Sequence, residues 1–185
     1  MTPTSKLNNV LRRFWIFHRD RRGVAAVEFS LILPIMLTIY LGGVEVGDGF
    51  AVDLKVTEVA HSVADLASQY VTIDDSDMSN ILNASAEIVA PYSALNIIVT
   101  VSEVSTDSNG NATVTWSDSL NGTARAVGQK ITLPASLKIP NISLILGEVS
   151  YNYTPNLGYV ITGTIVLSDN YYLFPRLSKT VARVN

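Results

Sequence analysis

The chain has 185 residues, no cysteine and a formal net charge of −3. The lack of cysteine excludes disulfides, thiolate nucleophiles and cysteine-ligated metal centres. The charge is divided unevenly, because residues 1–23 hold six Lys or Arg against one Asp, whereas residues 24–185 hold seven Lys or Arg against fifteen Asp or Glu. A basic arm on an acidic body is unlike a nucleic-acid-binding domain, and it matches a membrane protein whose basic end stays in the cytoplasm.

A long apolar run follows the basic arm. Between Val24 and Val46 the charged side chains are Glu28 and Glu45 alone. A helix of about 23 residues is roughly 34 Å long, which is enough to cross a bilayer. We therefore expect a cytoplasmic leader over 1–23, a transmembrane helix over 24–47 with Glu45 at its outer interface, and an extracytoplasmic domain over 48–185.

Glu28 lies inside the expected membrane segment, where an ionised carboxylate costs a few kcal/mol on insertion scales. Cleavage after Gly23 would give Val24 a cationic α-amine, four residues from Glu28 on the same helix face. The amine could instead pair with Glu28 of a neighbouring chain, which would also fix an assembly register. The alternative is an anchor that is never cut, in which Glu28 reaches the headgroup region.

A family resemblance rests on these residues. The stretch Gly23-Val24-Ala25-Ala26-Val27-Glu28-Phe29, between arginines and an apolar run that contains Pro34, resembles a class III prepilin cleavage motif. More narrowly, residues 21–47 resemble the N-terminus of TadE-like proteins, the minor pseudopilins of the Flp, or tight-adherence, pilus. The resemblance implies that Gly23 and Val24 flank the cleaved bond and that Glu28 and Phe29 are the family's Glu-Phe pair, which sets the assembly register.

The resemblance also implies a function. The protein would be cut by a prepilin peptidase at the bacterial inner membrane and would then assist assembly of an Flp-type pilus for surface attachment, in the membrane or in the pilus itself. Its partners would be the peptidase, the Flp pilin, other minor pseudopilins, the inner-membrane assembly platform and the lipid bilayer, with no nucleic acid. We expect no enzyme activity, cofactor or metal. The alternative is an uncleaved, single-pass binding module of the envelope.

Helical patterns continue beyond the membrane segment. Apolar residues recur at steps of four and three over 52–70, which predicts that the long helix continues to about Val71 and packs on its own domain. A glycine cluster over 42–49 could form a hinge, or could allow close packing on a partner helix. The acidic run 74–77 predicts the start of a second helix, which Pro91 ends; capping is favoured over a bound cation there.

Strand patterns occupy the rest of the chain. We expect a hairpin of strands 96–104 and 112–116 around Asn109-Gly110, a short helix over 123–130, and strands over 148–153, 159–167 and 176–184, the last of which closes the sheet. The tyrosines of this region predict packing on the sheet more than a binding surface. The fold class is therefore α+β and pilin-like, with a long N-terminal helix, a second helix and a small antiparallel sheet.

Catalytic patterns are missing from the sequence. His18 lies in the basic arm and His61 on a polar helix face, and neither stands near a nucleophile motif. There is also no zinc-protease motif, phosphate-binding loop or dinucleotide-binding glycine pattern. The sequence therefore predicts a structural protein.

Overall fold

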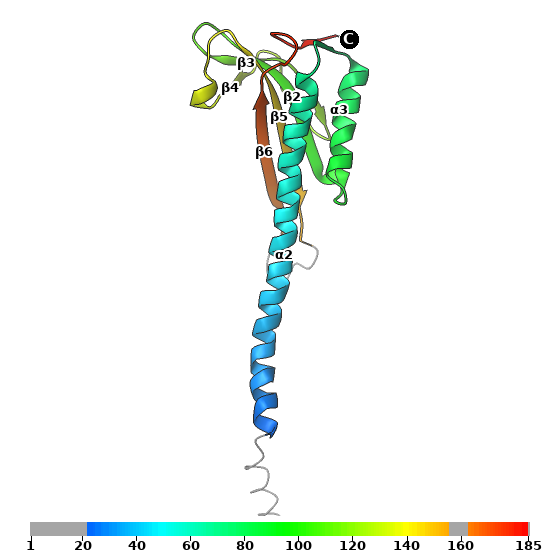
Figure 1. The fold of residues 1–185 in the computed structure, drawn as a ribbon, viewed down its shortest axis with the longest axis vertical. Helices are drawn as coiled ribbons and strands as arrows, with labels where there is room; N and C mark the ends of the chain where they lie inside the picture. The colour runs from blue at the N-terminus through cyan, green and yellow to red at the C-terminus, as the bar shows by residue number, and fades with distance from the viewer. Residues whose placement is uncertain (1–21, 156–162, 185) are drawn as a thin grey trace, which may run out of the picture.

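The computed structural model describes residues 22–155 and 163–184, and its dominant element is a single long helix (Figure 1). This helix, α2, runs over Arg22–Ser68. Its 47 residues make it roughly 70 Å long. The prediction that the helix continues beyond the membrane segment is confirmed, and it ends three residues before the predicted Val71. The expected basic leader lies outside the described residues except for its last two positions.

The upper half of α2 is buried in the core of the domain. Val52, Val56, Val59 and Val63 are all fully buried, and Leu66 and Tyr70 pack against the same core from its border. The predicted apolar seam therefore packs within its own chain. The glycines of the 42–49 cluster do not interrupt the helix.

The second helix, α3 (Asp75–Ile88), begins with the cap that the sequence predicts. The N–H of Asp77 donates to Asp74 Oδ1 at 2.8 Å, and the N–H of Asp74 donates to Asp77 Oδ2 at 3.5 Å. This reciprocal capping box satisfies two of the free donors at a helix start. The chain leaves α3 before Pro91 and passes through the short helix η1 (Ala94–Asn96) into the sheet.

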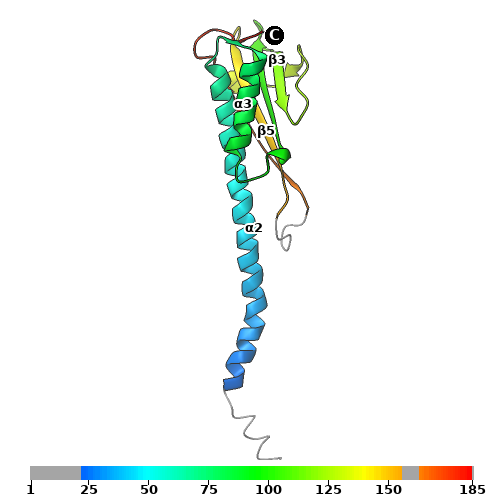
Figure 2. The same ribbon diagram turned by 90° about the vertical axis from the view of Figure 1, so that its right-hand side faces the viewer.

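A five-stranded antiparallel sheet lies behind α2, in the order β4-β3-β2-β5-β6. Its strands are β2 (Ile97–Thr106), β3 (Ala112–Leu120), β4 (Lys130–Ile131), β5 (Ser143–Tyr153) and β6 (Ile165–Leu173). Figure 2 shows both helices on one face of this sheet. The α+β class and the pilin-like arrangement of a long helix against an antiparallel sheet are confirmed.

A glycine sets how closely α2 approaches the sheet. A Cβ on Gly147 of β5 would lie 2.6 Å from the carbonyl oxygen of Ala60 and about 3 Å from two side chains of α2. Real Cβ atoms do not come that close to a backbone oxygen. The absence of a side chain at Gly147 therefore lets the helix backbone rest on the strand.

The other face of the sheet carries a small second core and a covering loop. The second core comprises Val104, Ala112, Leu133, Leu144 and Leu146, beside the short helix η2 (Ala135–Leu137). The predicted helix over 123–130 is wrong, because this segment is a loop that ends in a turn with Gly128 at φ 81°. The loop is tied to the sheet, since the N–H of Arg125 donates to Ser117 Oγ at 3.0 Å.

The last two predicted strands need correction. The segment 159–167 lies partly outside the described residues, and the strand observed is β6, which continues to Leu173 through Ser168, Asp169 and Asn170. An edge strand with no buried residue needs no apolar face. The polar residues in the middle of β6 therefore interrupt the apolar pattern from which a strand is predicted. The segment 176–184 does not close the sheet. It crosses the end of α2, where the N–H of Arg176 donates to the carbonyl of Ser68 at 2.8 Å.

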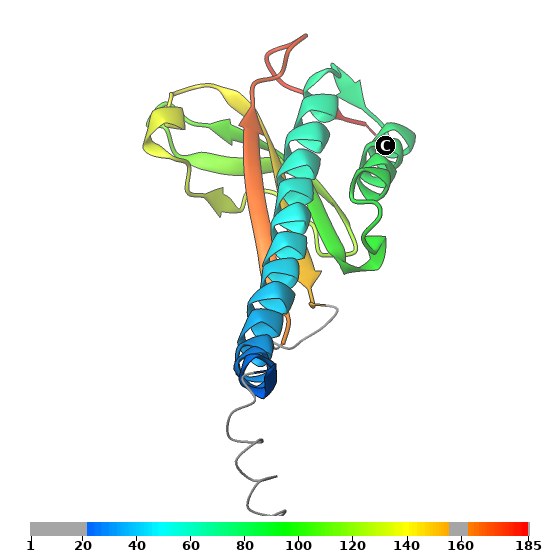
Figure 3. The same cartoon turned by 60° about the horizontal axis from the view of Figure 1, so that its bottom comes forward.

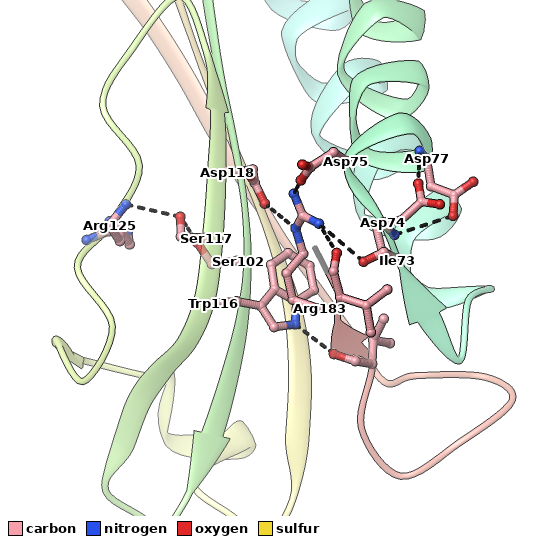
Figure 4. Close-up of polar contacts among 12 residues, drawn as sticks. Ile73, Asp74, Asp75, Asp77, Ser102, Trp116, Ser117, Asp118, Arg125 and Arg183 are labelled. Atoms are coloured by element: carbon pink, nitrogen blue, oxygen red, sulfur yellow. Dashed lines mark hydrogen bonds and ion pairs between the residues drawn. The ribbon is translucent and has the colours of Figure 1, made fainter.

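The C-terminal segment instead forms a parallel pair, β7 (Ala182–Arg183) with β1 (Thr72–Ile73). Figure 4 shows how side chains clasp it. Trp116 Nε1 donates to the carbonyl of Val181 at 2.7 Å, and the N–H of Val181 donates to the buried Glu103 Oε1 at 2.8 Å. Arg183 pairs with Asp118 at 2.9 Å and with Asp75. The clasp connects β2, β3 and the start of α3 to the C-terminus.

Candidate functional site

The residues expected to carry processing lie at the blue, N-terminal end of α2, far from the folded domain (Figures 1 and 2). A Cβ on Gly23 would meet no atom within 4 Å. Val24 and Phe29 are 53% and 59% exposed, and every residue from Gly23 to Tyr40 is classed as exposed. The bond after Gly23 is therefore presented without cover from any described part of the chain.

Glu28 is also exposed, and it has no hydrogen bond or ion pair with any residue that the structure describes. It follows Val24 by four residues on a continuous helix, which places the two about 6 Å apart along the axis on the same face. The helix thus brings Val24, which is expected to gain a charged α-amine, close to the carboxylate of Glu28. Phe29 points to a different part of the helix surface, because it lies only one residue further on.

The lower half of α2 presents apolar side chains on all sides. Its large exposed members are Val24, Val27, Phe29, Leu31, Ile32, Leu33, Ile35, Met36, Leu37, Ile39 and Tyr40. The helix is long and apolar enough to cross a membrane, and in the described part of the chain it is the one helix that is. An apolar surface all round a helix fits a lipid environment. These observations are consistent with a membrane anchor.

The hydroxyl groups of Ser30 and Thr38 in this lower half are satisfied within the helix. Ser30 Oγ donates to the carbonyl of Val27 at 2.8 Å, and Thr38 Oγ1 donates to the carbonyl of Pro34 at 2.8 Å. Pro34 lies inside the helix, which continues past it in the structure. Bonds of this kind suit a segment in lipid, because no water is there to replace them.

The domain begins to cover α2 at Glu45, which is 2% exposed. Glu45 was expected at an outer interface, and the structure buries it. The Tyr153 hydroxyl donates to the Glu45 backbone carbonyl at 3.3 Å, and a Cβ on Gly49 would lie in ordinary contact with the same ring, at 3.6 Å. Burial, followed by the charges of Asp48 and Glu45, raises the pKa of Tyr153, which therefore stays neutral. The sequence alone contains no signal for this contact, which joins residues 108 positions apart.

A second candidate site is a polar groove of about 530 Å³ on the sheet face away from α2. The loop that holds Arg125 forms one wall, and β6 forms the other. Arg125 makes a two-pronged ion pair with Glu148, with Nε–Oε2 and Nη2–Oε1 distances of 2.6 Å. The hydrogen bond to Glu148 raises the pKa of Arg125. The two charges neutralise each other, and the described residues that line the groove include no histidine.

Metal ligands do not gather in the described residues, where no group of three His, Cys, Asp or Glu side chains is found. The acidic run 74–77 is occupied by its own cap and by Arg183. His61, which the sequence places on a polar face, contacts the ring of Tyr171 with centroids 4.6 Å apart. His18 lies outside the described residues.

Comparisons with known proteins support the N-terminal resemblance. No curated protein and no solved structure matches the chain. One family model does match, that of the TadE-like proteins, and it covers residues 23–65. The match begins at the glycine of the expected cleavage motif and continues into the buried half of α2. The long N-terminal helix therefore matches the TadE-like protein family over residues 23–65.

Proposed function

We propose that this protein is a minor pseudopilin that assists assembly of an Flp-type pilus, after cleavage between Gly23 and Val24 by a prepilin peptidase. The family implies a role in pilus assembly. The observation that carries the finer proposal is Glu28, an exposed carboxylate without a described partner on an otherwise apolar stretch of helix. In lipid such a carboxylate requires a compensating positive charge.

Cleavage would supply that charge. The new α-amine of Val24 would lie one helical turn before Glu28 and could pair with it, or with Glu28 of a neighbouring subunit whose helix is shifted along the axis. Pairing between subunits would set the register of packed helices. The basic leader would stay on the cytoplasmic side, which places the folded domain on the outer side of the inner membrane.

The partners follow from this arrangement. The leader and the exposed bond after Gly23 would be the substrate of the peptidase. The apolar lower half of α2 would pack first with lipid and then with helices of the Flp pilin and other minor pseudopilins, recruited through the inner-membrane assembly platform. The chain itself contributes position and packing, and no chemistry.

A matched pair of glycine variants tests processing. In Gly23→Leu the peptidase should fail to cut, because its substrate loses the small residue before the cleaved bond, and pili should be absent or greatly reduced. Gly43→Leu makes the same change on the same helix, where a Cβ also meets nothing within 4 Å, and should be cut normally. Immunoblots for the size shift and electron microscopy for pili give the two readouts. Normal processing of Gly23→Leu would contradict the proposal.

A second pair of variants tests the role of Glu28. Glu28→Gln removes the charge and keeps the shape, so processing should continue while pilus number falls about tenfold or more, on the premise that one buried ion pair contributes at least 1.4 kcal/mol. Glu58→Gln, on the outer half of the same helix, is the control and should be silent, since Glu58 forms an exposed pair with Lys55. A silent Glu28→Gln would instead favour an uncleaved membrane-anchored binding module.

A further inference from the structure

The two edges of the five-stranded sheet differ. One edge is β4, which has two residues, and the other is β6, which has nine. β6 pairs with β5 in continuous register from Leu173–Ile145 to Ile165–Tyr153, with no bulge. None of its residues is buried. Long, regular edges present unpaired backbone groups that attract another strand, so native proteins normally shorten, charge or cover them.

The open side of β6 can be identified from one hydrogen bond. The N–H of Asn170 donates to the side chain of Asp169 at 2.8 Å, which marks Asn170 as a residue whose backbone faces away from β5. Backbone groups alternate in direction along an antiparallel strand. Val166, Ser168 and Tyr172 therefore direct their N–H and C=O groups to the same open side.

β6 itself lacks the residues that usually protect an edge strand. β6 contains no proline and no lysine, and its one charged residue is Asp169. Both carboxylate oxygens of Asp169 are engaged, since Oδ2 accepts from Thr57 Oγ1 at 2.7 Å and Oδ1 accepts from Asn170. The carboxylate of Asp169 is therefore held toward α2 and does not oppose the addition of a strand at the open edge.

The flank of α2 beside this edge supplies side-chain contacts. Thr57 contacts Asp169 and His61 contacts Tyr171, which places α2 and β6 side by side over about one helical turn (Figure 3). Phe50 and Leu54 lie one to two turns below these residues on the same flank and are 67% and 68% exposed. An added strand would turn every second side chain toward this flank.

An acidic residue on the same flank indicates which charge the partner segment should carry. Asp53 lies one turn below Thr57, is exposed, and has no hydrogen bond or ion pair with any described residue. The chain beyond residue 23 is also strongly acidic, with fifteen Asp or Glu against seven Lys or Arg. A partner segment with a lysine or arginine near Asp53 would therefore be favoured over an acidic one.

We propose that β6 is a docking edge for an extended segment of a different protein, which adds to the sheet as a sixth strand. Its backbone would pair with Val166, Ser168 and Tyr172, its alternate apolar side chains would cover Phe50 and Leu54, and a basic residue would meet Asp53. This mode of binding derives affinity from main-chain hydrogen bonds and specificity from alternate side chains.

An antiparallel pair between β6 and the β6 of a second copy of this chain does not fit one membrane. Because β6 lies along α2, an antiparallel β6–β6 pair would point the two long helices in opposite directions (Figure 1). Two such helices could not share one membrane in the same orientation. The inference rests on the membrane anchoring of α2 and does not require cleavage after Gly23. A mature chain that keeps Met1 would therefore overturn the proposed function and leave the proposed docking edge intact.

Site-specific photo-crosslinking in intact cells tests the docking edge. Benzoylphenylalanine is placed in turn at Val166, Ser168 and Asn170 of the full-length protein, with Leu95, which is 86% exposed, as the control position. We expect crosslinks to one partner protein. Each two-residue step of the probe along β6 should move the crosslinked position on the partner by about two residues. In a protein with the probe at Val166, Ser168→Pro should abolish the product, since proline removes an outward N–H, whereas Ser168→Ala should preserve it.

Several results would overturn the proposal: a product that survives Ser168→Pro, crosslinks to this chain's own β6, crosslinked positions scattered over the partner, or yields no higher than at Leu95. Thermal unfolding of the purified proline and alanine variants checks that the domain remains folded. If the proline unfolds it, Ser168→Lys provides the same test with the backbone N–H intact, since an edge lysine opposes strand addition. Undiminished crosslinking at Val166 in that variant would also overturn the proposal.

Discussion

The two halves of α2 are both rich in apolar residues, yet they lie in opposite environments. From Gly23 to Tyr40 every residue is exposed, whereas Val52, Val56, Val59 and Val63 are fully buried by the chain's own sheet and second helix. The lower half is apolar all round, and the upper half only along one stripe. The difference indicates that the upper half belongs to the core of the domain, whereas the lower half is suited to an apolar environment such as lipid.

The largest effect that separates the halves should come from a buried charge. Val59→Asp places a carboxylate in the core with no partner, a change that costs several kcal/mol, so the purified variant should show no cooperative unfolding transition. Val27→Asp makes the same change on the lower half, and the domain should unfold at the wild-type temperature. Circular dichroism in detergent measures both variants.

Val27→Asp should fail in a different assay. A second carboxylate in the membrane segment costs about 2.5–3.5 kcal/mol on insertion scales, so the variant should shift from the membrane fraction toward the soluble or degraded fraction. Equal effects of the two substitutions on domain unfolding would show that the halves do not act separately.

The next effect concerns the contact of α2 with the sheet. In Gly147→Val the added Cβ would lie 2.6 Å from the carbonyl oxygen of Ala60, so the helix must move away and the domain should lose about 1–3 kcal/mol of stability. Gly43→Val on the lower half meets nothing within 4 Å and should leave domain unfolding unchanged. Chemical denaturation in detergent distinguishes the two variants. A wild-type midpoint for Gly147→Val would contradict the close packing.

A smaller effect tests the clasp, which joins the C-terminal segment to β2 and β3. Trp116→Phe removes the donor to the carbonyl of Val181 while keeping most of the ring's packing, so it should cost about 1 kcal/mol. Amide hydrogen exchange should increase first over 180–184, because the C-terminal segment depends on this bond and on Glu103. Increased exchange along α2 instead would mean that the clasp and the helix unfold as one unit.

The smallest effect belongs to the hairpin turn at the far end of the sheet. Hydrogen bonds from the side chain and backbone of Asn111, with others from Asn109 and Gly110, lower the pKa of Asp107 below its usual 3.8. A lowered pKa stabilises the fold at pH values above 3.8, and this contribution is lost as pH falls through the lower folded-state value. Carboxyl NMR titration should give Asp107 a pKa below 3.8, and Asp107→Asn should slightly lower stability at neutral pH only.

The sequence predicts the elements whose signals are local. The seam over 52–70, the cap at Asp74 and the Asn-Gly hairpin each depend on neighbours a few residues away, and each is confirmed by the structure. The cleavage motif is also recognised from neighbouring residues. The family match over 23–65 supports the resemblance to TadE-like proteins, and the cleavage itself stays a prediction.

The remaining features depend on distant partners. β6 is a polar edge strand that is defined by its ladder with β5, and the C-terminal segment is held by Trp116 and Glu103, which lie more than sixty positions earlier. The segment 123–130 is a loop that is held by the bond from Arg125 to Ser117 and turns at Gly128, which has a positive φ. Glu45 is buried because Tyr153 and its surroundings cover it. None of these contacts leaves a periodic trace in the sequence.

The central claim is that this chain matures by loss of its basic leader, which frees an amine one turn before Glu28. Intact-mass analysis with N-terminal sequencing of the protein from its native membrane tests it directly. We expect a chain that begins with Val24-Ala25-Ala26 and whose mass lacks residues 1–23. A chain that begins at Met1, with its arginines still attached, would contradict it.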